Sequence, residues 1–93
     1  MRTIKYTAQF KRDYKREKRT QHNDLDKKLM FVIESLATDA QLPESLRDHR
    51  LYGNWKDHRD CHIRPNLVLI YRKPDIDTLE LVRLGSHSEL GLC

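Results

Sequence analysis

Residues 55–66, WKDHRDCHIRPN, concentrate ionisable side chains within twelve positions. The stretch holds two histidines, two aspartates and three basic residues, and it runs directly into the apolar segment LVLIY at 67–71. Histidine titrates near neutral pH and can therefore accept or donate a proton there. Two further histidines, His49 and His87, lie on either side of the stretch. These residue types suit acid–base chemistry carried out beside the protein core.

Several imidazoles, an aspartate and arginines, with no evident nucleophile, favour metal-free cleavage of RNA. In that reaction the 2′-hydroxyl of the substrate attacks the neighbouring phosphate. The protein must supply a base for that hydroxyl, an acid for the departing 5′-oxygen, and cations for the charge that builds on the phosphate. Histidine can meet the first two needs and arginine the third.

Each of these residues also has a purely structural interpretation. His58 suits a surface position on a strand, His62 a structural one, and Asp60 can simply pair with a neighbouring arginine. Cys61 suits a small buried apolar residue better than a reactive thiol. Trp55 can be a core residue or a stacking platform for a base. Histidines two apart on a strand, with no paired cysteines, are a weak zinc signal, so we expect neither a metal nor a cofactor.

The amino-terminal half predicts one strand and two helices that must help to position this chemistry. Residues 3–7, TIKYT, alternate and are rich in β-branched and aromatic types, as in a strand. Thr7 can cap a helix over 8–19 that has a thin apolar face, and Asn23 can cap the next helix. In that second helix the apolar residues recur at helical spacing; they are Leu25, Leu29, Val32, Ile33 and Leu36.

From residue 58 the period of the pattern changes to two, which is typical of strands. One face of the strand predicted over 58–64 is ionisable and the other is apolar; the ionisable side chains are His58, Asp60, His62 and Arg64. Residues 67–71 are apolar on both faces and predict a central strand covered on both sides. Pro74-Asp75 is expected to end that strand, 78–85 predicts the last strand, and a short turn or helical turn follows. Residues 38–54 are expected to form a loop.

The order β-α-α-β-β-β predicts a single α+β domain over residues 1–93, with a mainly antiparallel four-stranded sheet packed against the helical pair. If the last three strands form a meander, His87 lies within reach of the ionisable face. No apolar run can span a membrane, and MRTIKYTAQF does not resemble a signal peptide. Cys61 and Cys93 are too few for a disulfide framework, so we expect a reduced cytoplasmic protein.

The formal net charge of +4 is unevenly spread along the chain. Residues 1–22 hold eight basic and two acidic side chains, and residues 47–73 hold seven and three, whereas 23–46 and 74–93 each sum to −3. Two basic blocks that meet in space would suit an anionic polymer such as RNA. The alternative is that lysine and arginine merely solvate an exposed helix face.

The motifs in this chain resemble those of a known family; the stretches are DHRLYGNWKDHRDCHIRPNLVLIY at 48–71 and RLGSHSEL at 83–90. Together they are similar to the YafQ branch of the RelE-type bacterial toxins. The resemblance implies a compact α+β ribonuclease that enters the ribosomal A site, cuts mRNA there and is held inactive by a cognate antitoxin. It also implies functional roles for His49, His62, His87 and Asp60. Patterning alone does not rank His49 above His58.

Two positions depart from the pattern of the family. Asn66 stands where members commonly carry aspartate, and Gly91 stands where many carry an aromatic residue. The first change removes a negative charge beside the histidines, which should lower their pKa values and weaken proton transfer. Asn66 also follows Pro65 and suits a turn. The second change removes a possible stacking group.

We therefore expect His49 to act as general base and His87 as general acid, in roles that could be exchanged. His62 and Asp60 would hold and polarise the phosphate and its neighbours, with Asn66 beside them. The candidates for RNA contact are Arg59, Arg64, Arg83, Trp55, Lys56, Lys11 and Lys15. The expected partners are the 70S ribosome with its mRNA, ribosomal RNA at the basic helix, and an antitoxin through which the toxin–antitoxin complex would bind operator DNA.

Two alternatives to an active ribonuclease remain at this level. The first is a non-catalytic binding toxin on the same fold, like the gyrase-inhibiting relatives, which lack the histidine set. The second is an RNA-binding module made inactive by Asn66.

Overall fold

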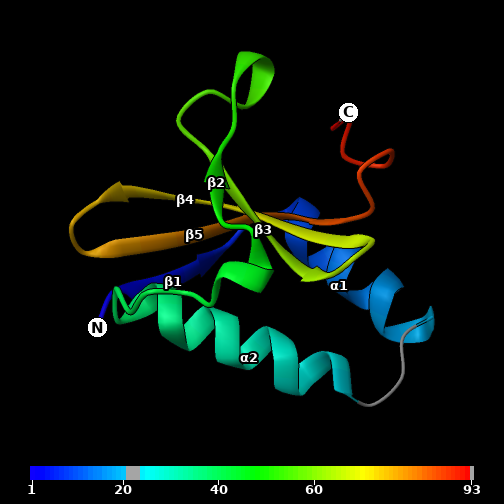
Figure 1. Ribbon diagram of the computed structural model, residues 1–93, viewed down its shortest axis with the longest axis horizontal. Helices are drawn as coiled ribbons and strands as arrows, with labels where there is room; N and C mark the ends of the chain where they lie inside the picture. Colours follow the sequence, from blue (N-terminus) through cyan, green and yellow to red (C-terminus); the bar gives the residue numbers. More distant parts are fainter. Residues whose placement is uncertain (21–23, 93) are drawn as a thin grey trace.

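The computed structural model describes residues 1–20 and 24–92, and in this part of the chain two helices lie against a five-stranded sheet (Figure 1). The elements in chain order are β1 (Thr3–Tyr6), α1 (Ala8–Thr20), α2 (Asp24–Ala37), the 3-10 helix η1 (Glu44–Leu46), β2 (His49–Arg50), the 3-10 helix η2 (Gly53–Trp55), β3 (Arg59–Arg64), β4 (Leu67–Asp75) and β5 (Thr78–Gly85). The α+β class and the predicted order of the helices and longer strands are confirmed.

The strands lie in the order β1-β5-β4-β3-β2. β1 runs parallel to β5, and the other neighbouring pairs are antiparallel. The prediction of four strands missed β2, which falls in the segment expected to be a loop. β2 has two residues, too few to show alternation in the sequence, and it forms because His49 pairs with Asp60 and Arg50 with Arg59.

Both helices follow the patterns in the sequence. The backbone N–H of Phe10 donates to Oγ1 of Thr7 at 2.9 Å, so the predicted cap of α1 is confirmed. The apolar stripe of α2 is buried along its whole length, whereas the predicted cap at Asn23 lies outside the described residues. Neither helix in the described ranges is long and apolar enough to cross a membrane.

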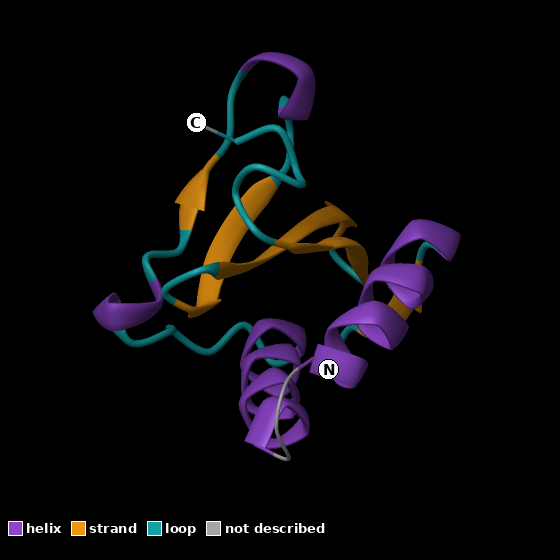
Figure 2. Cartoon of the chain, turned by 90° about the vertical axis from the view of Figure 1, so that its right-hand side faces the viewer, coloured by secondary structure: helices purple, strands orange, loops and turns teal. Residues whose placement is uncertain are grey.

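The sheet has apolar contacts on both faces, which confirms the prediction for the central strand. The helix face carries alternate residues of β4; these are Leu67, Leu69 and Tyr71, which pack with Phe10 and the α2 stripe. Val68 and Ile70 point to the opposite face and pack with Leu51 and Leu90. Figure 2 shows the two long helices together on one side of the sheet and the loop that carries η2 projecting away from them.

The central strand ends at the predicted dipeptide Pro74-Asp75, because β4 continues through Pro74 and its last residue is Asp75. β3 begins at Arg59, which pairs with Tyr71, so the last part of β4 has β5 as its partner on one side only. Proline lacks a backbone N–H and is tolerated in such an edge position. A register shift between Arg72 and Asp75 also interrupts the regular pairing of β4 with β5 around the proline.

The inner face of α1 carries buried charges that the sequence pattern does not reveal. β1 pairs only with Thr78–Leu81, and α1 packs along β5. Asp13, 2% exposed, accepts the backbone N–H of Leu84 at 3.0 Å, and Arg16 donates to the carbonyl oxygen of Leu84 at 3.0 Å. Side chains of α1 therefore take the place of a neighbouring strand at Leu84.

Candidate active site

The sheet brings the predicted site residues together from three separate segments. β2 pairs His49 with Asp60, and β3 carries His62 two residues further on. The register links His62 across β4 to the end of β5, after which His87 follows. The ring centroids lie 6.4 Å apart for His49 and His62, and 4.9 Å apart for His62 and His87. The expected meander is confirmed, and we call His49, His62, His87 and Asp60 the histidine cluster.

The ring of His49 is oriented by a backbone contact. Its Nδ1 lies 2.7 Å from the carbonyl oxygen of Arg47 and 2.9 Å from Oδ1 of Asp60. A carbonyl oxygen can only accept a hydrogen bond, so Nδ1 carries the proton in the neutral ring. Nε2 of His49 then bears the free lone pair, which is the arrangement that a general base requires.

Asp60 is a buried carboxylate without a full set of hydrogen bonds. Its side chain is 2% exposed, and its Oδ1 has no hydrogen bond within the described structure despite the nearby ring of His49. Burial raises the pKa of Asp60, although the three imidazoles act in the opposite direction. The alternative that Asp60 simply pairs with Arg59 or Arg64 is wrong, because each of these arginines has another partner. A side chain so deeply buried can contact its histidine neighbours but not a molecule bound at the surface.

His62 occupies a half-buried position at the centre of the cluster. Burial lowers its pKa, the negative charge of Asp60 raises it, and the positive charges of His87 and Arg47 lower it further. A lowered pKa was expected from the absent carboxylate at residue 66, but the leading cause here is burial. Asn66 itself lies exposed in the turn between β3 and β4, and its effect on the histidines stays a prediction.

The three arginines predicted to contact RNA are all engaged in ion pairs. Arg59 contacts Asp48 at 3.2 Å, Arg83 contacts Asp13 at 2.7 Å, and Arg64 pairs with Asp24 at the start of α2. The prediction that Arg64 shares a face with His62 is wrong, because a register shift in β3 between these residues turns Arg64 toward the helices. Lys56, Lys11 and Lys15 are exposed.

Arg47 is a cation that the sequence analysis missed. It is exposed, and within the described residues it has no ion pair. Its carbonyl oxygen orients His49, and its positive charge lowers the pKa of His62. Nothing local in the sequence separates Arg47 from the other arginines, because its position depends on the pairing of β2 with β3.

His58 is separated from the cluster, and its predicted place on the ionisable strand face is wrong. It lies just before β3 begins, and its ring stands edge-on to Trp55 with centroids 5.4 Å apart. Trp55 is half-buried and donates its indole N–H to the carbonyl oxygen of Leu90 at 3.2 Å. It packs against the apolar residues on the sheet face opposite the helices, which we call the second apolar cluster: Leu51, Val68, Ile70 and Leu90. The structure therefore favours His49 over His58 as a member of the site.

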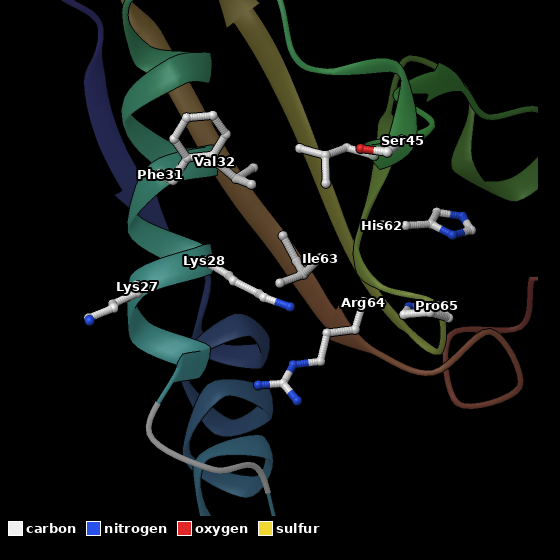
Figure 3. Close-up of a pocket in the computed structure, with 10 residues that line it drawn as sticks. Lys27, Lys28, Phe31, Val32, Ser45, His62, Ile63, Arg64 and Pro65 are labelled. Atoms are coloured by element: carbon white, nitrogen blue, oxygen red, sulfur yellow. The ribbon is translucent and has the colours of Figure 1, made fainter.

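A groove opens between α2 and the end of β3 (Figure 3). The ring of His62 points away from α2, whereas Arg64 extends toward that helix (Figure 3). Lys27, Lys28 and Phe31 line the α2 side of the groove. The sequence does not single out these two lysines as candidates for RNA contact, because they lie in a segment whose net charge is negative.

The remaining candidates for reactivity are structural. Cys61 is fully buried, and burial strongly raises the pKa of its thiol, in agreement with its interpretation as a small apolar residue. Across residues 1–20 and 24–92 there is no group of three or more His, Cys, Asp or Glu side chains arranged to hold a metal ion.

The comparisons with known proteins identify the class. Residues 2–91 match the family described as "Bacterial toxin of type II toxin-antitoxin system, YafQ". An α+β fold of this kind, with a histidine cluster on the sheet, is therefore that of a type II toxin. The chain belongs to the YafQ family.

Individual relatives agree with this assignment. The mRNA interferase toxin YafQ of Escherichia coli K12 is 34% identical over 89 residues, which cover 96% of this chain and 95% of that protein. The structure of a copper-bound mutant toxin from Helicobacter pylori superposes with a TM-score of 0.89 at 38% identity, covering 97% of this chain and 99% of that one. The E. coli DinJ–YafQ complex gives a TM-score of 0.84 at 32% identity, covering 97% and 98%.

Proposed function

We propose that this protein is a ribosome-dependent mRNA endonuclease that cuts the message in the ribosomal A site and thereby stops translation. The observation that carries the proposal is the histidine cluster, in which three imidazoles from β2, β3 and the segment after β5 surround one buried carboxylate. The name of the E. coli relative, an mRNA interferase toxin, supports it. As a consequence the toxin acts in the cytoplasm, where ribosomes translate.

The proposed reaction needs no external nucleophile. Nε2 of His49 accepts the proton of the 2′-hydroxyl, and the 2′-oxygen attacks the adjacent phosphorus. The bond from phosphorus to the 5′-oxygen breaks, and protonated His87 donates its proton to that oxygen. The products are a 2′,3′-cyclic phosphate and a 5′-hydroxyl. The contact between Nδ1 of His49 and the Arg47 carbonyl supports the assignment of His49 as the base.

The other members of the site stabilise charge. His62 lies between the two transfer residues and would hold a phosphate oxygen, while the negative charge of Asp60 favours the protonated form of His62. Arg47 would neutralise the negative charge that builds on the phosphate, because Arg59, Arg64 and Arg83 already have carboxylate partners. No step in this scheme requires a metal or an organic cofactor.

The partners follow from the class and the surface. A cognate antitoxin would neutralise the toxin, as the existence of an E. coli DinJ–YafQ complex supports, and would connect the complex to operator DNA. The exposed side of α1 is cationic, since both of its acidic residues, Asp13 and Glu17, are buried. That side, with Lys11 and Lys15, would contact ribosomal RNA.

A non-catalytic binding toxin is the alternative function. The convergence of three histidines on one carboxylate argues against it, because binding alone needs no such set. An inactive RNA-binding variant, disabled by Asn66, is addressed by the substitution described in the Discussion.

Primer extension on translated and untranslated transcripts tests the proposal. Cuts are expected only when ribosomes occupy the message, and equal cutting of naked RNA would refute ribosome dependence. Analysis of the fragment ends tests the chemistry, because a 5′-phosphate on the downstream fragment would point to activated water and rule out attack by the 2′-hydroxyl.

A further inference from the structure

The segment after β5 is a single helical turn closed at its start by a reciprocal pair of hydrogen bonds. The backbone N–H of Ser86 donates to the Glu89 carboxylate at 2.9 Å, and the backbone N–H of Glu89 donates to Oγ of Ser86 at 3.2 Å. This is the capping box S-x-x-E. His87 is the residue directly after the capping serine, so the box determines the direction in which its backbone leaves β5.

The same turn is closed at its other end by a second motif. The backbone N–H of Leu92 donates to the carbonyl oxygen of His87 at 2.8 Å, and that of Gly91 donates to Ser88 at 3.3 Å. Gly91 has a φ of +71°, so this is a Schellman motif with glycine in the left-handed position. The glycine that replaces the family's aromatic residue thus has a conformational role, and the carbonyl of His87 is itself held by the motif.

An ion pair between Glu89 and Arg16 connects the turn to α1. Glu89 lies 3.5 Å from Nε of Arg16, and Arg16 is in turn held by buried Asp13 at 3.1 Å and by the carbonyl oxygen of Leu84. Gly85 allows this close packing, because a Cβ at residue 85 would lie 3.1 Å from Arg16 and 3.3 Å from Glu89. The backbone N–H of Ser86 lowers the pKa of Glu89, which keeps the carboxylate ionised.

Apolar packing fixes the other side of the turn. Leu90 is buried in the second apolar cluster beside Val68, and its carbonyl oxygen accepts the indole N–H of Trp55. Val68 is the residue that pairs with both His62 and Gly85 in the sheet. The turn therefore packs over Val68, the residue of β4 that pairs with His62 in β3.

We propose that Ser86, Glu89 and Arg16 are positioning residues that hold His87 against His62 by fixing the capped turn to α1. The expected effect on the cleavage rate rests on the proposed function. The expected effect on the position of the His87 ring does not depend on it. None of the three side chains needs to touch RNA. The turn holds the ring of the general acid at the 4.9 Å centroid separation from His62 seen in the structure.

Glu89→Ala and Ser86→Ala test the proposal, with Ser86→Thr as the conservative rescue, because threonine keeps the capping hydroxyl. Glu34→Ala, on the exposed side of α2, is the matched control. The first readout is the nuclear Overhauser contact between the rings of His62 and His87 in the isolated toxin. The second is the separation of kcat from KM in ribosome-dependent cleavage, measured below the unfolding transition of each variant.

In Glu89→Ala and Ser86→Ala the ring contact should weaken and kcat should fall about 10–100-fold, as expected for a misplaced catalytic group. KM should stay within about twofold of the wild-type value, because a positioning residue outside the substrate contact does not change uniform binding. Ser86→Thr and Glu34→Ala should retain both the ring contact and the wild-type kcat.

Retention of the ring contact in both alanine variants would overturn the inference. Loss of the contact with kcat unchanged would also overturn it, because the placement of His87 would then not matter for cleavage. If Glu89→Ala does not fold, the comparison of Ser86→Ala with Ser86→Thr decides by the same two readouts. A wild-type toxin that cuts no mRNA would remove the proposed function, whereas the ring contact would still decide the placement of His87.

Discussion

Asp60→Asn should make the protein more stable and less active. Asparagine has nearly the same shape as aspartate but carries no charge, so the change removes a buried carboxylate while it retains the packing. The wild-type side chain is 2% exposed, and Oδ1 lacks a hydrogen bond within the described structure because Nδ1 of His49, although 2.9 Å away, bonds to the Arg47 carbonyl oxygen instead. An unmade hydrogen bond at a buried polar group costs about 1–3 kcal/mol.

We expect Asp60→Asn to gain about 1–2 kcal/mol in the free energy of unfolding at neutral pH, because the amide keeps polar atoms at the same buried position but removes the additional cost of burying a charge. For a domain of this size the gain corresponds to a rise of about 4–16 °C in Tm. Cleavage should fall by about 10²-fold, since the negative charge that favours protonated histidine is lost.

The gain should depend on pH in a defined direction. Burial raises the pKa of Asp60 in the folded protein above the usual value of an aspartate. The ionised carboxylate therefore destabilises the folded state above the folded pKa, and the penalty disappears once the pH falls below the unfolded pKa. The advantage of Asp60→Asn over wild type should accordingly be full at neutral pH and vanish below about pH 4.

Thermal unfolding of both proteins at several pH values measures this difference directly. Asp57→Asn is the control, because residue 57 is exposed and has a φ of +69°, which asparagine tolerates well; its stability should stay within about 0.5 kcal/mol of wild type. The reasoning is refuted if Asp60→Asn is no more stable than wild type at neutral pH, or if its advantage persists unchanged in acid.

Three further substitutions test the site. His87→Ala should stay within about 0.5 kcal/mol of wild-type stability and slow cleavage by about 10²–10⁴-fold; a large fall in Tm with activity spared would make this residue structural. Asn66→Asp should raise the pKa of nearby histidines, increase the cleavage rate and deepen growth arrest in cells without antitoxin, at equal Tm because both residues suit the turn. Unchanged activity would show that Asn66 is only a turn residue. Arg47→Gln should slow cleavage by at least about tenfold, whereas Arg50→Gln, in the nearby strand β2, should not; equal effects in a cleavage assay would remove Arg47 from the site.

The sequence determined the features that depend on local periodicity. The spacing of the apolar residues in α2 and the alternation after residue 58 predicted the helix, the strands and the doubly covered β4, and the structure confirms them. The side chains of Asp60 and His62, two residues apart on one strand, could be placed together for the same reason.

Tertiary structure decided what depends on pairing between distant segments. His49 joins the site and His58 does not because β2 pairs with β3, and a strand of two residues has no pattern of its own. The ion-pair partners of Arg64 and Arg83 could not be predicted from the sequence either, because an ion pair depends on which elements lie side by side in the fold.

The environment of each charge was also decided only on folding. Asp13 lies in a helix whose sequence is mainly basic with a thin apolar face, yet it is buried and bonded to the backbone N–H of Leu84, which lies beyond the residues that β1 pairs with. The exposure of Asp60 and the orientation of the His49 ring follow from the same long-range packing. A pKa depends on burial and on nearby charges in three dimensions, so the sequence could name the candidate residues, whereas only the fold shows the surroundings of each one.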